Sequence, residues 1–355
     1  MSTTGTTTRS DADLAFQTEI LQQVSQTYAM TIPLLPPQLR HAVTNGYLLC
    51  RIADSIEDDP DMALADKENY LHQFAAIVAA EKPAGPFAGR LAAQLGPTTP
   101  ESVRRLVRNS EQVIRVTLSF ESRQRKALER CIRVMSTGML EFQQYENSQG
   151  LKDIAQLERY CYFVAGVVGE MLAELFCAYS TEIDKRSEQL QVRSVSCGKG
   201  VQLTNIIKDI WDDQREGMCW LPRDLFLESG FDLNDLAVGQ ANPGFSDGLV
   251  KLIAVARNHL LEGLGFALAI PSSEYRIRRQ IVSSLGLSAL MLRKVYFSET
   301  FDRGEEISLS KTSVRNVVGL LNLLARSDVA LRTIFFLLTR PLPKVNSPQT
   351  ASEQQ

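Results

Sequence analysis

The strongest constraint on this chain is a polar stripe inside an apolar stretch, residues 199–222. Gln202, Asn205, Asp209 and Asp213 follow one another at steps of 3, 4 and 4 residues, which places them on one face of an α-helix. Most flanking positions are Val, Leu or Ile, which would hold such a helix in a core. Carboxylates in apolar surroundings need cationic partners, because burying an unpaired charge is very costly. The stretch therefore predicts a long helix with one polar face turned to an internal site.

A second stripe of the same kind lies about 150 residues earlier. Tyr47, Arg51, Asp54 and Asp58 share one helical face among Leu and Ile residues. Acidic pairs four residues apart are also common on solvated helix surfaces, and a single pair would favour that interpretation. Two such stripes, both flanked by apolar residues and both carrying amide, phenol or guanidinium groups, favour one shared site.

The donor types in the two stripes suit a hard cation. Mg²⁺ prefers carboxylate and amide oxygens and often shares its remaining positions with phosphate. The predicted metal ligands are Asp54, Asp58, Asn205, Asp209 and Asp213. Arg51 and Lys208 could donate charge-assisted hydrogen bonds to a diphosphate held between the helices. Mg²⁺ would make that diphosphate a leaving group, and the resulting carbocation would need a dry, apolar cavity.

A third apolar stretch, residues 158–176, could form a wall of that cavity. Tyr160 precedes Val164 and Val168 by four and eight residues, which predicts that all three face the cavity. A phenol beside a cation can steer proton loss or stabilise charge, although Tyr160 could instead cap the core. The small residues of the stretch either allow close helix packing or leave room for an isoprenoid tail: Ala165, Gly166 and Gly169.

Composition indicates an ordinary globular protein. The chain has 355 residues, 44% hydrophobic and 22% charged, with a net charge of −3. The sequence lacks the basic patch that is typical of a nucleic-acid-binding protein. Its six cysteines form no C-x-x-C pair. We predict a disordered tail over 1–11, one helical domain over 12–340 and a polar tail over 341–355.

The periodicity predicts an all-α fold, since no segment shows sustained two-residue alternation. The predicted helices are at about 12–29, 38–57, 64–81, 101–119, 122–147, 152–180, 186–213, 244–268, 273–296, 311–326 and 328–338, with a surface loop over 82–100. Residues 160–179 are apolar but contain Glu170 and Glu174, which favours a buried helix over a membrane span. The apolar run 334–338 is expected to pack in the core, with peripheral membrane contact as the alternative.

Three motifs in order, residues 54–59, 160–169 and 202–213, resemble the squalene/phytoene synthase family. The resemblance extends from about Ser25 to Tyr296. It implies a single-domain isoprenoid-synthase fold with a central apolar cavity and head-to-head condensation of two prenyl diphosphates. The family's functional residues would correspond to Tyr47, Arg51, Asp54, Asp58, Tyr160, Gln202, Asn205, Asp209 and Asp213, and its diphosphate-binding serine motif to Ser25, Thr27 and Tyr28.

Within the family, the segment Cys219–Pro222 is most similar to squalene synthases. The resemblance then implies that two farnesyl diphosphates condense to presqualene diphosphate, which NADPH reduces to squalene. Gln280-Ile281 stands where an aromatic-Cys pair is expected, and no Gly-rich dinucleotide motif occurs. An NADPH-independent synthase of dehydrosqualene, phytoene or presqualene diphosphate is therefore the alternative. A third possibility is a non-catalytic scaffold that binds isoprenoids.

From these features we predict a cytoplasmic protein with at most peripheral contact with the inner face of the membrane. The sequence leaves the oligomeric state open, and a monomer is compatible with it.

Overall fold

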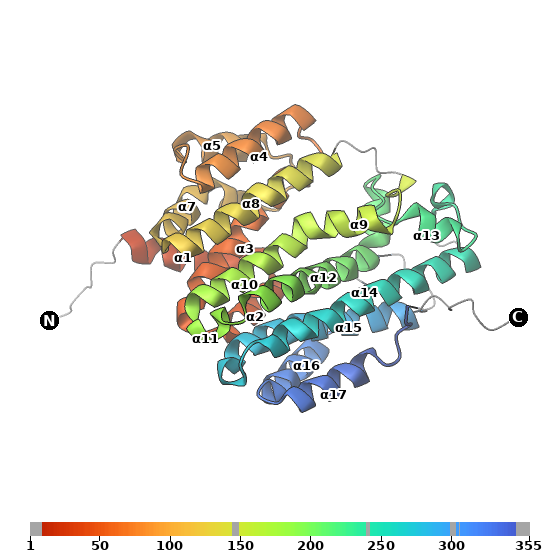
Figure 1. The fold of residues 1–355 in the computed structure, drawn as a ribbon. Coiled ribbons are helices and arrows are strands. Elements are labelled where there is room, and N and C mark those ends of the chain that lie inside the picture. The colour runs from red at the N-terminus through yellow and green to blue at the C-terminus, as the bar shows by residue number, and fades with distance from the viewer. Residues whose placement is uncertain (1–8, 144–148, 239–241, 299–302, 305, 346–355) are drawn as a thin grey trace, which may run out of the picture.

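The computed structural model describes residues 9–143, 149–238, 242–298, 303–304 and 306–345. Within these ranges every regular element is a helix, and the one isolated backbone bridge joins Leu151 to Pro222. The chain forms a single domain, so the all-α prediction is confirmed (Figure 1).

The first half of the chain contains α1 Arg9–Val24, α2 Gln26–Thr31, α3 Pro37–Glu57, α4 Leu64–Val78, α5 Gly85–Gln94, α6 Glu101–Arg108, α7 Ser110–Ser119, α8 Ser122–Gln143, α9 Ile154–Cys161, the π-helical turn η3 Tyr162–Gly166 and α10 Val167–Tyr179. The second half contains α11 Thr181–Asp184, α12 Ser187–Arg215, α13 Arg223–Leu227, α14 Pro243–Ala269, α15 Tyr275–Phe297, α16 Lys311–Leu324 and α17 Asp328–Thr339. Short 3-10 turns lie at Ile32–Leu34, Leu233–Asp235 and Ser272–Glu274.

The long helix α12 lies at the centre of the second half of the fold, packed against α10, α14 and α15 (Figure 1). Small residues let these helices approach closely. A Cβ at Gly169 would collide with the carbonyl oxygen of Ser194, and one at Gly198 would collide with that of Ala165. Close packing is therefore the role of Gly169.

The helices that carry the two stripes, α3 and α12, share one neighbouring helix. Both α3 and α12 pack against α10, whereas they make at most marginal backbone contact with each other. A buried hydrogen-bond network holds α3 in place, since Asn45 donates to Gln17 of α1 and accepts from Thr117 of α7. Helix α10 is therefore the common neighbour of the two helices that carry the stripes.

Several predicted boundaries were wrong. Helix α1 begins at Arg9, inside the predicted tail, while residues 1–8 lie outside the described residues. The predicted helix 12–29 breaks at Ser25, whose hydroxyl caps the separate helix α2. The predicted helix 101–119 breaks at Asn109.

The predicted loop 82–100 contains helix α5. Pro86 lies in its first turn, where the missing N–H costs no helical hydrogen bond, so this proline does not break the helix. Phe87 and Leu91, four residues apart, are buried and hold α5 to the core. At the other end, Leu342 is buried inside the predicted polar tail, while residues 346–355 lie outside the described residues.

Two helical stretches are long and apolar enough to cross a membrane, Ile154–Tyr179 and Pro243–Ala269. Helix α10 packs between α8 and α12, and α14 packs against α12 and α15. Both stretches thus lie among the packed helices of the domain, in agreement with the buried helix predicted for 160–179. In the late apolar run, Phe335 and Leu338 are buried, whereas Phe336 and Leu337 are exposed.

Candidate active site

Beyond its first two turns, α3 is accessible only along the first stripe. Between residues 42 and 59, the positions that are not buried are Tyr47, Arg51, Asp54 and Asp58. All other side chains of this stretch, on every other face, pack into the protein. The stripe therefore lines an opening that water reaches, and it is not an ordinary solvated helix face.

The carboxylates of this stripe are only loosely neutralised. Arg51 lies 3.9 Å from Asp54 and 3.7 Å from Asp58, too far for good hydrogen bonds. Burial and the neighbouring Asp58 charge raise the pKa of Asp54 to about 7, and Arg51 opposes this shift. Burial also raises the pKa of Asp58. Arg51 and Lys67 both oppose the rise at Asp58 without reversing it, so these cations do not fully compensate the two carboxylates.

Two neighbouring acids differ sharply in their surroundings. Asp59 is buried and accepts hydrogen bonds from the backbone N–H groups of Asp61 and Gly96, which gives it a structural role. Glu57 is also buried, but its Oε1 has no hydrogen-bond partner. Burial, Asp58 and Asp54 raise the pKa of Glu57. An excess of acidic groups therefore surrounds this end of α3.

The second stripe is accessible along α12, where Asn205 is exposed and Gln202, Asp209 and Asp213 are half-buried. Lys208 Nζ lies 2.8 Å from Asp209 Oδ1. Asp213 forms no ion pair among the described residues, and burial, followed by the Asp209 charge, raises its pKa to about 7. The charge of Asp58, the residue that follows α3, makes a smaller contribution to the same rise.

Asp212, between these two carboxylates, is held by other groups. It pairs with Arg215 at 3.0 Å and accepts a hydrogen bond of 2.9 Å from the backbone N–H of Gly304. A Cβ at residue 304 would lie 2.6 Å from Asp209 Oδ1, so only glycine fits here without displacing the carboxylate. Gly304 therefore lies directly against the second stripe.

The two stripes suit cations that a ligand bridges. No three Asp, Glu, His or Cys side chains in the described ranges are close enough together to form a metal site by themselves. The carboxylates instead form two separated pairs with raised pKa values, beside the unpartnered oxygen of Glu57. This donor set fits Mg²⁺, which binds through one or two carboxylates and keeps water or phosphate in its other positions.

Tyr160 lies at the end of α9, beside the same acidic groups. Its side chain is buried, and its ring stacks on that of Trp220 with centroids 4.0 Å apart. Phe142 of α8 contacts it at 5.2 Å between centroids. Burial, then the charges of Glu57, Asp58 and Asp213, raises the pKa of the phenol. Tyr160 therefore stays protonated and can act as a hydrogen-bond donor.

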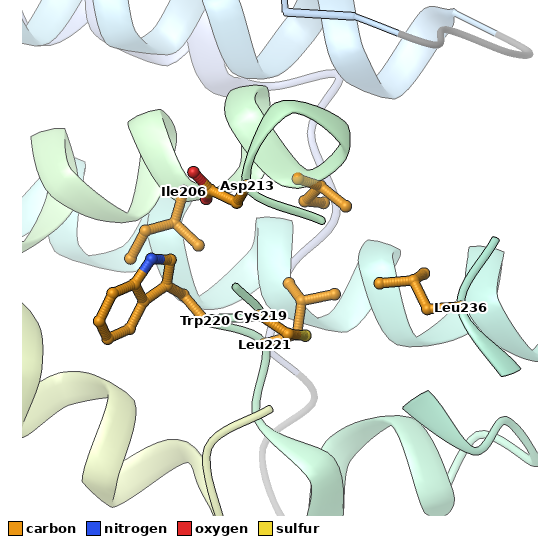
Figure 2. A pocket seen from close by; sticks show the side chains of 7 residues that line it. Ile206, Asp213, Cys219, Trp220, Leu221 and Leu236 are labelled. Carbon is orange, nitrogen blue, oxygen red and sulfur yellow. The ribbon is translucent and has the colours of Figure 1, made fainter. Parts of the chain in front are cut away.

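Trp220 reaches this position because the chain turns back after α12. The backbone N–H of Leu151 donates to the carbonyl oxygen of Leu221, and that of Arg223 donates to Leu151. Figure 2 shows Asp213, on α12, and Trp220, on this returning segment, at the edge of the same small cavity. The cavity measures about 10 Å³, roughly the room that one water needs.

Comparison with known proteins identifies the family. The sequence pattern of the squalene/phytoene synthases matches residues 21–310. The chain belongs to the squalene/phytoene synthase family. It is 27% identical to the squalene synthase of Schizosaccharomyces pombe over 259 residues, 72% of this chain and 54% of that protein. It is 34% identical to the phytoene synthase of Thermus thermophilus over 131 residues, 34% of this chain and 43% of that protein. The chain spans about half the length of the curated relatives it matches.

Solved structures show the same fold. The complex of TcSQS with the ligand BPH1237 superimposes with a TM-score of 0.77 at 20% identity, over 96% of this chain and 94% of that one. A dehydrosqualene synthase in complex with a ligand superimposes with a TM-score of 0.66 at 20% identity, over 90% and 98% of the two chains. The predicted isoprenoid-synthase fold is thus confirmed.

The serine motif lies beside the first stripe of this family member. The Ser25 hydroxyl accepts a hydrogen bond of 3.1 Å from the backbone N–H of Tyr28, and Thr27 is exposed. The rings of Tyr28 and Tyr47 are in contact, with centroids 4.7 Å apart, and the Tyr47 hydroxyl donates to the carbonyl oxygen of Val24. The structure thus brings Ser25 and Tyr28 next to the stripe of α3.

The predicted alignment of Tyr160 with Val164 and Val168 rested on regular α-helical spacing. The π-helical turn η3 interrupts that spacing, because its hydrogen bonds span five residues and it shifts the following side chains around the axis. Val164 and Val168 are half-buried, and Tyr162 points to Glu170, with a distance of 3.3 Å between its hydroxyl and Oε2. The shared face is therefore not continuous through this segment.

Three further residues belong to the site that the sequence did not indicate as functional candidates: Glu57, Trp220 and Gly304. Glu57 and Trp220 stood inside recognised motifs, yet nothing in their spacing indicated a role. Gly304 lies in the connection between α15 and α16, and only the tertiary structure brings it to Asp209.

Proposed function

We propose that this chain is a squalene synthase, which condenses two farnesyl diphosphates to presqualene diphosphate and reduces it to squalene with NADPH. The observation that carries the proposal is the stripe of Tyr47, Arg51, Asp54 and Asp58, which are the positions between residues 42 and 59 that are not buried. The charge of Asp58 also raises the pKa of Asp213 on α12. A scaffold without catalysis would gain nothing from so many poorly compensated carboxylates.

In this proposal Asp54 and Asp58 on α3, with Asn205, Asp209 and Asp213 on α12, hold the metal ions. Bound Mg²⁺ supplies Lewis-acid activation of the diphosphate leaving group. Arg51 and Lys208, now paired with neighbouring aspartates, can turn to phosphate oxygens when cations neutralise those aspartates. Gln202, Ser25, Thr27, Tyr28 and Tyr47 provide further hydrogen-bonding groups around the same opening.

Tyr160 is proposed to assist the proton loss that closes the cyclopropane ring. Because its pKa is raised, the phenol is a poor base by itself. It can stabilise the cation through its oxygen, or pass a proton to the released diphosphate while accepting one. Trp220 and Phe142 cover its ring and limit access of water to it. Val164 and Val168 are proposed to contact the prenyl chains.

The reductive step rests on family membership, and no residue of this chain is assigned to NADPH. The relatives include a phytoene synthase and a dehydrosqualene synthase, so an NADPH-independent product is the second candidate. We further propose a cytoplasmic location with at most peripheral membrane contact.

Product analysis tests these proposals. The full chain is incubated with farnesyl diphosphate and Mg²⁺, with and without NADPH, and products are identified by mass spectrometry. Squalene formed only with NADPH supports the first candidate, whereas dehydrosqualene or presqualene diphosphate in both reactions supports the second. Absence of any condensation product, with geranylgeranyl diphosphate as well, would leave only an isoprenoid-binding role. Full turnover in EDTA would refute the metal assignment.

A further inference from the structure

The last two helices carry an unusual surface. Helices α16 and α17 run together along one edge of the molecule and pack on the α14 and α15 layer (Figure 1). Leu321 of α16 and Leu331, Phe335 and Leu338 of α17 are buried and face that layer. The opposite faces of both helices therefore point away from the protein on the same side.

These outer faces are rich in exposed apolar side chains. The exposed fractions are 42% for Leu320, 79% for Leu323, 75% for Val329, 57% for Phe336 and 51% for Leu337. On α17, Val329, Phe336 and Leu337 lie on one stripe because they are separated by seven and eight residues, close to two helical turns. Large apolar residues gathered on one face of a soluble domain usually mark an interaction surface.

The charge on the same segment identifies the partner. Residues 311–345 contain six Lys and Arg but one Asp, a net charge of +5, whereas the whole chain has −3. The remainder of the chain therefore carries −8. Asp328 pairs with the buried Arg278, so the only acid of the segment is already neutralised. The exposed cations of this segment are Lys311, Arg315, Arg332, Arg340 and Lys344. Arg326 is also exposed, but its guanidinium lies over the ring of Tyr275 on α15.

We propose that the outer face of α16 and α17 docks on an anionic phospholipid bilayer, with Leu320, Leu323, Val329, Phe336 and Leu337 entering the interface and the surrounding arginines contacting lipid phosphates. Amphipathic helices with Leu and Phe on one side and Arg or Lys around them bind membranes in this orientation. The negative remainder of the chain would be repelled, so only this face is turned to the lipid. Membrane docking is inferred from the exposed apolar and basic residues of α16 and α17 and does not depend on the proposed function. If the proposed function is correct, docking would let the enzyme deliver its hydrocarbon product to the bilayer.

Vesicle flotation with the purified full chain, without substrate, tests the proposal. We expect binding to phosphatidylcholine vesicles containing 30% phosphatidylglycerol, weakened by salt, and little binding to phosphatidylcholine alone. The triple variant Arg315→Gln, Arg332→Gln, Arg340→Gln should weaken binding about a hundredfold, at about fivefold per charge. Leu323→Ser with Phe336→Ser should weaken it at least about tenfold.

The matched control is Leu227→Ser on α13, which is 55% exposed but lies far from α16 and α17 (Figure 1). It should bind vesicles as the parent chain does. The proposal is overturned if the parent chain does not bind anionic vesicles at low salt, or if the control loses as much binding as Leu323→Ser with Phe336→Ser. It is also overturned if sedimentation shows a dimer that Phe336→Ser abolishes, which would make a second copy the partner. Condensation of farnesyl diphosphate in solution, measured on the same variants, should be unchanged and so separates this result from failure of the proposed function.

Discussion

The indole ring of Trp220 lies parallel to the phenol ring of Tyr160, with centroids 4.0 Å apart and an interplanar angle of 7°. The two residues come from segments 60 positions apart in the sequence, joined by the backbone bridge between Leu151 and Pro222. Stacking of this kind holds an aromatic ring in one orientation. Trp220 thus fixes where the Tyr160 hydroxyl points relative to the acidic groups.

Removing the hydroxyl of Tyr160 should block the first half-reaction while preserving the fold. Tyr160→Phe keeps the ring and its stacking, so the melting temperature should be unchanged. Presqualene diphosphate formation should fall about a hundredfold or more, in the range of a lost general acid-base group. Tyr162→Phe is the control and should have little effect. Near-normal first-step rates in Tyr160→Phe would return this residue to a packing role.

The stack itself is tested at Trp220. Trp220→Leu removes the indole ring that stacks on Tyr160, so the phenol ring can rotate more freely. Because the hydroxyl is then less well oriented, kcat should fall about tenfold or more. Trp220→Phe keeps an aromatic surface and should retain most of the activity. If both variants are equally impaired, or both are normal, the ring of Trp220 does not position Tyr160.

Asp58 and Asp59 are adjacent in the sequence, but we expect the first to affect catalysis and the second to affect stability. Asp58→Asn should lower kcat about a hundredfold or more, about 3 kcal/mol of transition-state stabilisation, with little change in melting temperature. Asp59→Asn weakens the buried hydrogen bonds to the backbone of Asp61 and Gly96, and should cost about 1 to 3 kcal/mol of folding stability while kcat is kept. Urea denaturation and steady-state kinetics on both variants check the pair. The reverse pattern would show that the roles are exchanged.

The raised pKa values predict how stability depends on pH. Asp54 and Asp213 have folded-state pKa values of about 7 against an ordinary value of 3.8, so the folded protein binds more protons than the unfolded chain between these limits. Their contribution to stability is therefore greatest below about pH 4 and is lost as pH rises to about 7.

Bound cations should reverse this loss, since they stabilise the ionised carboxylates. The increase in melting temperature on adding Mg²⁺ should be larger at pH 8 than at pH 5, and Asp54→Asn with Asp213→Asn should remove most of the difference. Scanning calorimetry in EDTA and in Mg²⁺ at both pH values measures this. If Mg²⁺ raised the melting temperature equally at the two pH values, the cation would bind at a site other than Asp54 and Asp213.

The contact of Gly304 with α12 predicts a sensitive position outside the recognised motifs. Gly304→Ala would place a methyl group 2.6 Å from Asp209 Oδ1 and so displace the carboxylate or the loop. We expect kcat/KM to fall about tenfold to a hundredfold and the Mg²⁺ concentration for half-activation to rise. The control is Gly319→Ala, at an exposed position of α16 where no atom lies within 4 Å of the added methyl group. This substitution should stabilise the protein slightly, because alanine favours the helix more than glycine does. Unchanged Mg²⁺ activation in Gly304→Ala would refute the role.

Sequence by itself determined the two stripes, because helical periodicity is a local property. Asp54 and Asp58, like Asp209 and Asp213, share a face whatever else the chain does, and the surrounding Leu and Ile residues predict that this helix is enclosed. The all-α class and most of the long helices followed for the same reason. Where local signals were ambiguous, as at Pro86 in α5 and Ser25 before α2, the boundaries were wrong.

Only the tertiary structure decided which acidic residues serve the site. Asp59 and Asp212 look equivalent to their neighbours in the sequence. In the structure, however, their carboxylates accept hydrogen bonds from the backbone N–H groups of Gly96 and Gly304. The stacking of Trp220 on Tyr160 and the π-helical turn at Tyr162–Gly166 likewise depend on how distant helices pack. Such contacts join residues far apart in the chain, and their energies depend on positions that no local pattern specifies.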